Sequence, residues 1–516
     1  MSNSKTIVKN SGWFGIETVL SAVVSLLTSV LVNRYLGPQK NGYLIYVSYV
    51  SGLVGCLGGV GIAATTRKYM AEFIGMGDWG TARYIYIRTL LLQTGIATLT
   101  TGGILFWAMR DASADYRLAA ALMVLSIWPS MVNSPSSQAN AATEDLSKNM
   151  PASVASAIAY LLTITATVFL HWGVTGVGAS MFIMRAVDFL VRFFPTMKRA
   201  LAWKTPQPHP SGLRRRMVPF ALQAVASMTV SQIVWGRSEV ILLKNLYADI
   251  RQVSYYSLAF TMADQLLLVA TIFGSAVGIT IFAQYGRDKS KLPELAATAF
   301  RCIALMSIPL HFIAASLAVP ALLVVYGHKF EGAEAVVLLA PLLCMFKAFG
   351  GPAQSLMESA EKQRYVIAAT VIAGIVDISV AWTLIPAHAA VGACIGNGAA
   401  QLTAVGLMWG ISTYLYKVKL PWMLVAKVSL CSLLASVTAH YIAVRLAPIW
   451  AIACGGSAAL VVLFSLFYLL RVLEPEDQVR FRVITRMLPN SIARLADALL
   501  LLLIRADVEP ASPWRA

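Results

Sequence analysis

Charged residues are scarce in this chain. Asp, Glu, Lys and Arg make up 13% of its 516 residues, whereas a soluble globular domain carries about a quarter. Hydrophobic residues make up 58%, and the mean hydropathy is +0.69. They cluster in runs close to the roughly 20 residues that a helix needs to cross a bilayer. The composition predicts an all-α polytopic membrane protein.

The sequence also lacks the patterns that usually carry enzyme chemistry. It contains no GxxxxGK[ST] phosphate loop, no HExxH and no CxxC. The six cysteines lie in or beside apolar runs, which is typical of buried thiols. We therefore predict no catalytic residue, no metal and no cofactor. A polytopic polymerase, ligase or glycosyltransferase is the enzymatic alternative, but the chain has no long outer loop for a catalytic region.

The basic residues are concentrated in every second loop between apolar runs. The formal net charge is +17, which on a soluble protein would suggest nucleic acid as a partner. Here the distribution follows the positive-inside rule, so no nucleic acid is needed to explain it. An even number of spans then places both termini in the cytoplasm. We predict about fourteen spans, at 12–33, 41–66, 83–108, 116–140, 150–172, 174–197, 217–243, 253–284, 294–325, 335–358, 365–386, 388–415, 421–446 and 449–472.

The chain divides at a polar segment, residues 199–216, in which three prolines within residues 206–210 prevent helix. A weak internal repeat relates the two sides and aligns Tyr43 with Tyr255 and, one place off, Arg88 with Arg301. Transporters built from such repeats bind their substrate between them, so we predict two related bundles around a central cavity. The predicted domains are a six-helix bundle at 1–198, a cytoplasmic linker at 199–216, a second six-helix bundle at 217–416, two extra transmembrane helices at 417–473 and a cytoplasmic amphipathic tail at 474–516.

The stretch RYLGPQKNGYL separates the first two predicted spans. A Gly-Pro pair ends the first helix, since proline cannot continue it, and the tyrosines suit the membrane interface. This stretch resembles the pattern R-x-L-G-P-x-x-x-G-x-Y of the polysaccharide transporter, or Wzx-type oligosaccharide flippase, branch of the MOP superfamily, which also contains the MATE exporters and the lipid II flippase. The matching residues are Arg34, Leu36, Gly37, Pro38, Gly42 and Tyr43.

The resemblance extends to the length, the number of spans, the six-then-eight division and the repeat. It implies two bundles in a V shape around a central cavity, and alternating access for a lipid-linked sugar in a bacterial inner membrane. The implied partners are the bilayer, the lipid-linked oligosaccharide and other polysaccharide assembly proteins. The diphosphate of such a substrate must cross hydrocarbon, and arginine binds phosphate in bidentate fashion.

Ionisable side chains inside spans are the best site candidates, because charge is costly within the bilayer. Arg237 lies too deep for easy snorkelling, and Glu239 faces another side of the helix. Arg185 and Asp188 are three residues apart, so they could instead pair with each other. The predicted substrate-binding cations are Arg237, Arg185, Lys347, Arg88 and Arg301.

Two of these cations have a simpler explanation, because Arg88 and Arg301 could snorkel to the cytoplasmic surface. Glu17, Asp264 and Asp377 are candidates for carrying coupling protons or sodium, since burial raises a carboxyl pKa. Packing of these acids against arginines is the alternative. The polar run NSPSSQAN at 133–140 could line the cavity or form the cytoplasmic end of span four.

Three functions are compatible with these sequence features. The first is a flippase or exporter of a lipid-linked oligosaccharide for O-antigen, capsule or exopolysaccharide synthesis. The second is a cation-coupled exporter of the MATE type, which predicts twelve spans and prominent acids in the cavity. The third is a membrane scaffold subunit of a polysaccharide synthase. The several basic residues in spans favour the first.

Overall fold

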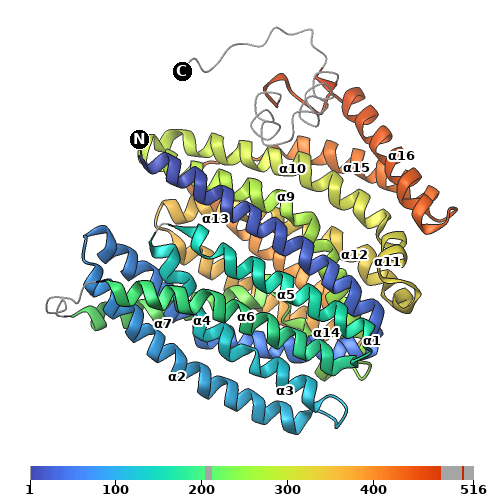
Figure 1. Ribbon diagram of the computed structural model, residues 1–516. Coiled ribbons are helices and arrows are strands. Elements are labelled where there is room, and N and C mark those ends of the chain that lie inside the picture. The colour runs from blue at the N-terminus through green and yellow to red at the C-terminus, as the bar shows by residue number, and fades with distance from the viewer. Residues whose placement is uncertain (1, 144, 204–211, 478–502, 505–516) are drawn as a thin grey trace. The chain divides into compact units, whose positions relative to one another are not determined.

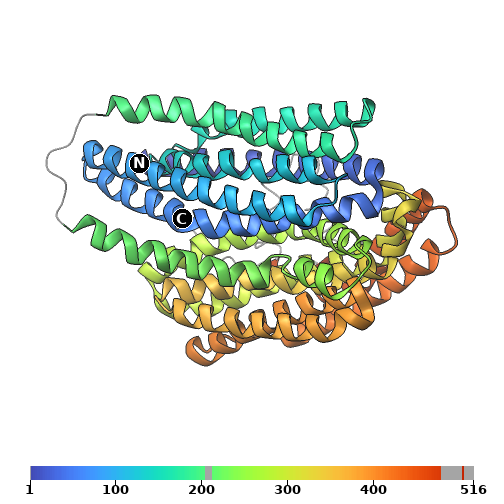
Figure 2. The ribbon, with the colours of Figure 1, turned by 90° about the horizontal axis from the view of Figure 1, so that it is seen from below.

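The computed structural model describes residues 2–143, 145–203, 212–477 and 503–504. Within these ranges the chain forms helices and no β-strand (Figures 1 and 2). The α-helices are α1 (Ser2–Gly75), α2 (Trp79–Asp111), α3 (Arg117–Leu125), α4 (Ile127–Ala142), α5 (Met150–Phe169), α6 (Gly173–Ala202), α7 (Leu213–Trp235), α8 (Glu239–Leu246), α9 (Arg251–Arg287), α10 (Leu292–Ser316), α11 (Ala318–Tyr326), α12 (Glu334–Cys344), α13 (Gly350–Ser359), α14 (Gln363–Tyr416), α15 (Trp422–Ala443) and α16 (Pro448–Leu469). Short 3₁₀ helices are η1 (Leu146–Lys148), η2 (Lys289–Lys291), η3 (His328–Ala333) and η4 (Met345–Phe349).

Ten helical segments among the described residues are long and apolar enough to cross a membrane. Two of them, α1 and α14, each contain a kink and cover two of the predicted spans. The predicted spans 217–243 and 253–284 fall on α7–α8 and α9, which are outside the ten. Every predicted span therefore coincides with helix, and the predicted all-α membrane fold is confirmed.

The predicted turn between the first two spans is a single-residue kink in α1. Gly37 has φ 72° and ψ 175°, while the residues on both sides continue the helix. A positive φ is easily reached only by glycine, and Pro38 then supplies a fixed φ that suits the first turn of the next helical segment. In α14 the corresponding kink is at Ala389 (φ 47°, ψ −125°), three residues after Pro386.

Contacts group the chain into two compact units, residues 1–257 and 258–516, called unit 1 and unit 2 below. In unit 1, α1 packs against α2, α4, α5 and α7, and α5 packs against α6. Small residues allow close helix contacts. A Cβ atom added to Gly42 would lie 2.3 Å from the carbonyl oxygen of Ile250. Gly42 thus has a packing role in addition to its place near the start of the second predicted span.

Unit 2 is built around α10 and α14. α10 packs against α12 and α15, α15 pairs with α16 (Figure 1), and α14 contacts α12 and α13. Trp409 of α14 donates its indole N–H to the carbonyl oxygen of Phe349 over 2.9 Å. The domain limits at 198, 216, 416 and 473 stay predictions, because the grouping into units follows contacts and not the sequence repeat.

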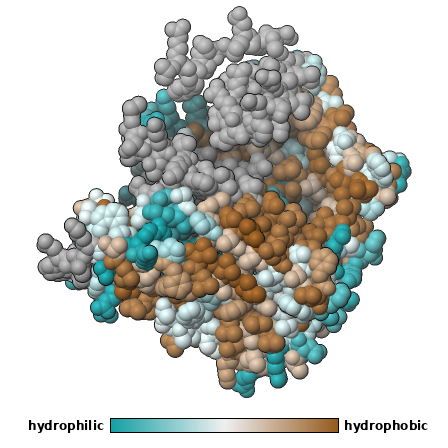
Figure 3. Space-filling view, viewed as in Figure 1, coloured by the Kyte–Doolittle hydropathy of each residue, from teal (hydrophilic) through white to brown (hydrophobic). Residues whose placement is uncertain are grey.

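Large apolar side chains are exposed along the helices of both units, as lipid contact requires. In unit 1, Leu99 is 79% exposed and Phe169 is 78% exposed. In unit 2, Val461 is 66% exposed. Figure 3 shows broad hydrophobic areas on one face of the molecule. The protein is thus a multi-pass membrane protein.

The predicted linker and tail are described only at their edges. α6 continues to Ala202 and α7 begins at Leu213, so helix enters residues 199–216 from both sides. The three prolines lie outside the described residues, as does most of the predicted amphipathic tail.

Candidate functional site: a basic cavity within unit 1

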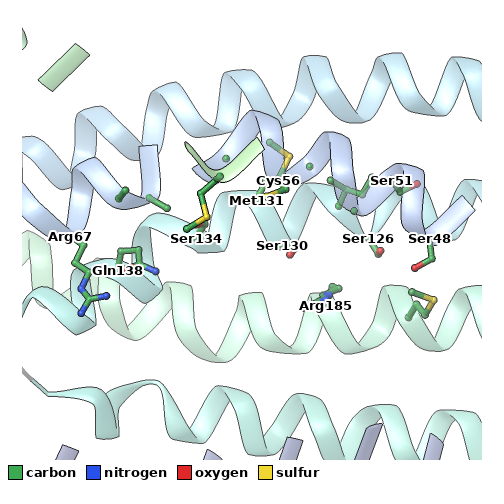
Figure 4. A pocket seen from close by; sticks show the side chains of 18 of the residues that line it. Ser48, Ser51, Cys56, Arg67, Ser126, Ser130, Met131, Ser134, Gln138 and Arg185 are labelled. Atoms are coloured by element: carbon green, nitrogen blue, oxygen red, sulfur yellow. The ribbon is translucent and has the colours of Figure 1, made fainter. Parts of the chain in front are cut away.

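Unit 1 contains a cavity of about 850 Å³, within the range of ligand pockets. Its wall comes mainly from the second part of α1, from α4 and from α6, and Figure 4 shows the side chains that line it. The polar lining residues are Ser48, Ser51, Cys56, Arg67, Lys68, Ser126, Ser130, Ser134, Gln138 and Arg185.

One wall is a polar stripe along α4. Ser126, Ser130, Ser134 and Gln138 recur every four residues, which places them on one helix face. Ser126 donates to the carbonyl oxygen of Met123 over 2.6 Å. Among the described residues, the side chains of the other three make no hydrogen bond with the protein. Their hydroxyl and amide groups are therefore available to a ligand.

Three basic side chains line the cavity, and none of its lining residues is acidic. Arg185 of α6 lies opposite Ser126 and Ser130, and Arg67 lies near Gln138 (Figure 4). Lys68 next to Arg67 places its ammonium 4.0 Å from the ring centroid of Phe220. Such a set makes the cavity electropositive and favours an anionic ligand.

Arg185 is not neutralised by the acid one turn away. Asp188 pairs instead with Arg192 at 2.7 Å and accepts a hydrogen bond from the amide of Asn133 over 2.6 Å. The Arg185–Asp188 pair that the spacing allowed is thus not formed, because Asp188 is fully engaged elsewhere. No carboxylate of the described residues lies within 4 Å of Arg185. An unpaired arginine in a membrane helix indicates a functional site.

Arg237, the first predicted substrate contact, does not line this cavity. The predicted span 217–243 is broken, and Arg237 lies in the break between α7 and α8. It donates to the carbonyl oxygen of Ser257 over 3.3 Å. Glu239 starts α8, is fully buried and accepts a hydrogen bond from Tyr256 over 2.7 Å. Both side chains therefore hold the beginning of α9.

Arg88 and Arg301, which the repeat nearly aligns, have different surroundings. Arg88 is exposed, with its guanidinium carbon 5.4 Å from the ring centroid of Tyr84. Arg301 is only 8% exposed and forms ion pairs with Asp477 at 2.7 Å and Glu474 at 3.0 Å. Neither arginine lines the cavity of unit 1.

The remaining candidates lie mostly in unit 2. Lys347 in η4 is 3.5 Å from Asp264 in α9, so each has an ionic partner. Asp377 in α14 is 1% exposed. The side chain of Glu17 lies outside those that the structure describes. Of the predicted cations, only Arg185 lines the cavity of unit 1.

Most of the cavity wall was not predicted from the sequence. Arg67 and Lys68 have the sequence context of basic loop residues, yet α1 continues past them to Gly75. Ser134 and Gln138 belong to the polar run at 133–140, but Ser126 and Ser130 were not predicted to line a site. The four-residue spacing of polar side chains in an apolar span was the signal that could have identified them.

Comparison with known proteins agrees with this fold. The family model described as "Polysaccharide biosynthesis protein" matches residues 31–335. A search of curated proteins gave no match. Solved structures with the same fold include the lipid II flippase MurJ in an inward closed conformation, with a TM-score of 0.66 and 13% identity over 91% of this chain and 99% of that one.

A second similar structure is the inward-facing form of a multidrug resistance MATE transporter of the MOP superfamily. Its TM-score is 0.64, with 14% identity over 77% of this chain and 95% of that chain. The predicted polysaccharide family and the predicted MOP-type fold are confirmed, and together they support a flippase or exporter. Because the family model covers more than half of the sequence, the chain belongs to the polysaccharide biosynthesis protein family.

Proposed function

We propose that the protein moves a polyprenyl-diphosphate-linked oligosaccharide across the inner membrane by alternating access, for the synthesis of O-antigen, capsule or exopolysaccharide. The observation that carries this proposal is the lining of the cavity in unit 1, with Arg67, Lys68 and Arg185 and no acidic side chain. Membership of a polysaccharide biosynthesis family supports the substrate class.

The basic lining addresses the most costly part of such a transport step. A diphosphate that leaves water for a low-dielectric environment loses solvation worth many kcal/mol unless charges or hydrogen bonds replace it. Arg185 and Arg67 offer guanidinium groups that bind phosphate oxygens in pairs, and Lys68 adds a point charge. The serines and Gln138 of α4 offer partners for sugar hydroxyl groups.

The same lining distinguishes this proposal from a MATE-type exporter of cationic drugs. A cationic substrate would be repelled by three basic side chains and would find no carboxylate in the wall. A scaffold role does not require unpaired charge in a membrane helix, which is costly.

The other residues predicted from the sequence stay part of the proposal. Arg237, Lys347, Arg88 and Arg301 stay predicted substrate contacts. Glu17, Asp264 and Asp377 stay candidates for coupling to a proton or sodium gradient. The distribution of basic loops supports cytoplasmic termini. Other polysaccharide assembly proteins are proposed partners.

The proposal is tested by complementing a deletion strain with the wild type, Arg185→Ala, Arg237→Ala or Arg110→Ala at equal membrane expression. Arg110 is the control, since it is exposed at the end of α2 beside Phe106 and does not line the cavity. Deletion should remove surface glycan and leave lipid-linked intermediates inside the cell. Wild type and Arg110→Ala should restore the glycan, and Arg185→Ala should restore about a tenth or less.

Other outcomes identify the alternatives. Normal surface glycan in the deletion strain, together with sensitivity to cationic drugs, would contradict the flippase function and indicate a MATE-type exporter. Full restoration by both arginine variants would favour a scaffold. If Arg237→Ala failed to restore the surface glycan while Arg185→Ala restored it, the substrate path would lie outside the cavity of unit 1.

A further inference from the structure

A buried glutamine lies behind the cavity wall of unit 1 without any partner. Gln93, in the middle of α2, has an exposed fraction of 0%. Neither its amide nitrogen nor its amide oxygen has a hydrogen-bond partner among the described residues. An unsatisfied buried polar atom costs about 1–3 kcal/mol, so a protein keeps such a group for a reason other than packing.

The wall between Gln93 and the cavity has no side chain at one position. Gly59 of α1 is one of the lining residues. A Cβ atom built on Gly59 would point to Gln93, because among the described residues outside the local helix only the amide nitrogen of Gln93 lies within 4 Å of it, at 3.5 Å. Because Gly59 has no side chain, the amide of Gln93 lies directly behind the backbone of a lining residue.

A second buried polar group on the same side of the cavity is also unpartnered. Ser51 lines the cavity two helical turns before Gly59, is 3% exposed, and its hydroxyl has no hydrogen-bond partner among the described residues. Gln93 and Ser51 together offer donors and acceptors but no charge. Hydroxyl groups are neutral ligands that match both functions of an amide.

The position along α1 separates this region from Arg67 and Lys68, while Arg185 lies opposite Ser126 and Ser130. Arg67 follows Gly59 by eight residues, which is about 12 Å along a helix. A substrate with its diphosphate near Arg67 and Lys68 would extend its sugars past Gly59 toward Ser51.

We propose that Ser51 and Gln93, which lies behind the backbone of Gly59, form a sugar-recognising subsite of the unit 1 cavity that binds hydroxyl groups of the oligosaccharide. This inference rests on the proposed function and extends it, because it assigns the neutral and the anionic parts of the substrate to different residues. Gln93 is thus a specificity-determining residue of the transport site.

The test uses the purified full-length protein in lipid nanodiscs with two separate probes. One probe is the oligosaccharide released from the strain's own lipid-linked intermediate, and the other is inorganic diphosphate. The variants are Gln93→Leu, Gly59→Ala and the control Gly95→Ala. Gly95 lies in α2 near Gln93 but does not line the cavity, and a Cβ atom there would meet nothing within 4 Å.

We expect Gln93→Leu and Gly59→Ala to weaken oligosaccharide binding about tenfold or more, since the first removes the amide and the second places a methyl group 3.5 Å from its nitrogen. Gly95→Ala should bind the oligosaccharide like the wild type. Diphosphate affinity should stay unchanged in all three variants. Gln93→Leu should not lower the melting temperature, because it replaces an unsatisfied amide by an apolar side chain of similar size.

Two results would overturn the subsite while leaving the proposed function intact. One is oligosaccharide affinity in Gln93→Leu and Gly59→Ala equal to that of the wild type. The other is a clear loss of thermal stability in Gln93→Leu with unchanged affinity, which would mean a structural role. A wild-type protein that binds neither probe would instead remove the proposed function itself.

Discussion

At the scale of single residues, ionic partners separate structural charges from those available to a ligand. Spacing in the sequence allowed Arg185 to pair with Asp188, yet the acid pairs with Arg192 and Arg185 faces the cavity. The choice depends on which neighbouring helix offers a better partner, here Asn133 of α4. Sequence position alone identified the charged residues but could not assign their partners.

Arg301 illustrates the same point in unit 2. Its guanidinium group binds both carboxylate oxygens of Asp477, at 2.9 Å and 2.7 Å, and the Asp477 side chain is fully buried. The two residues are 176 positions apart, so no local pattern predicts the pair. The near-equivalent Arg88 forms no ion pair within the described part of the chain and lies exposed beside Tyr84.

Removing one member of this buried pair should destabilise the protein strongly. Arg301→Ala leaves the buried carboxylate of Asp477 without its main cation, and breaking a buried pair costs about 3–5 kcal/mol. Arg88→Ala should change stability by about 0.5 kcal/mol or less, as at most surface positions. Thermal unfolding of the protein in detergent measures both.

The double variant Arg301→Ala/Asp477→Ala supplies the control. Because both charges are then absent, its loss should be smaller than the sum of the two single losses. Equal unfolding temperatures for Arg301→Ala, Arg88→Ala and the wild type would show that the pair does not anchor residues 474–477.

At the scale of helical elements, the sequence predicted where each span lies better than it predicted the kinks and breaks within the spans. The kink at Gly37 follows from glycine and the next proline, and was expected at that place. The break at Gly236–Ser238 within the predicted span 217–243 was not expected. The polar stretch Gly236, Arg237, Ser238 and Glu239 marks the break, but it was interpreted as charge inside a span because apolar residues resume at Val240.

The packing of α1 depends on glycines as much as on apolar side chains. A methyl group on Gly42 would lie 2.3 Å from the carbonyl oxygen of Ile250, a contact that requires the backbone to move. Gly42→Ala should therefore lower stability by about 1–3 kcal/mol through overpacking. Gly95→Ala in α2 is the matched control, because nothing lies within 4 Å of its added methyl group.

Melting temperatures of the two alanine variants test this contact directly. A lower melting temperature for Gly42→Ala would support the close approach of α1 to Ile250. For Gly95→Ala the melting temperature should stay unchanged or rise, because alanine has a higher helix propensity than glycine. If Gly42→Ala melted like Gly95→Ala, the close approach would be wrong.

At the scale of the whole molecule, composition and hydropathy predicted the fold class, and the short R-x-L-G-P motif predicted the polysaccharide family. The cavity could not be predicted in the same way. It combines residues of α1, α4 and α6 that are more than 100 positions apart in sequence, such as Arg67 and Arg185. Only the packing of these helices reveals that their polar faces meet.

The central claim is that the basic cavity carries an anionic lipid-linked oligosaccharide. The most direct measurement is translocation of the strain's own lipid-linked oligosaccharide in proteoliposomes that contain the wild type, Arg185→Lys or Arg185→Glu. We predict that the wild type moves the lipid between leaflets faster than protein-free vesicles do. Arg185→Lys should retain part of this rate, and Arg185→Glu should lose about tenfold or more, because it places a negative charge in the wall of a cavity that carries an anion. Equal rates for Arg185→Glu and the wild type, or a wild type no faster than protein-free vesicles, would contradict the account.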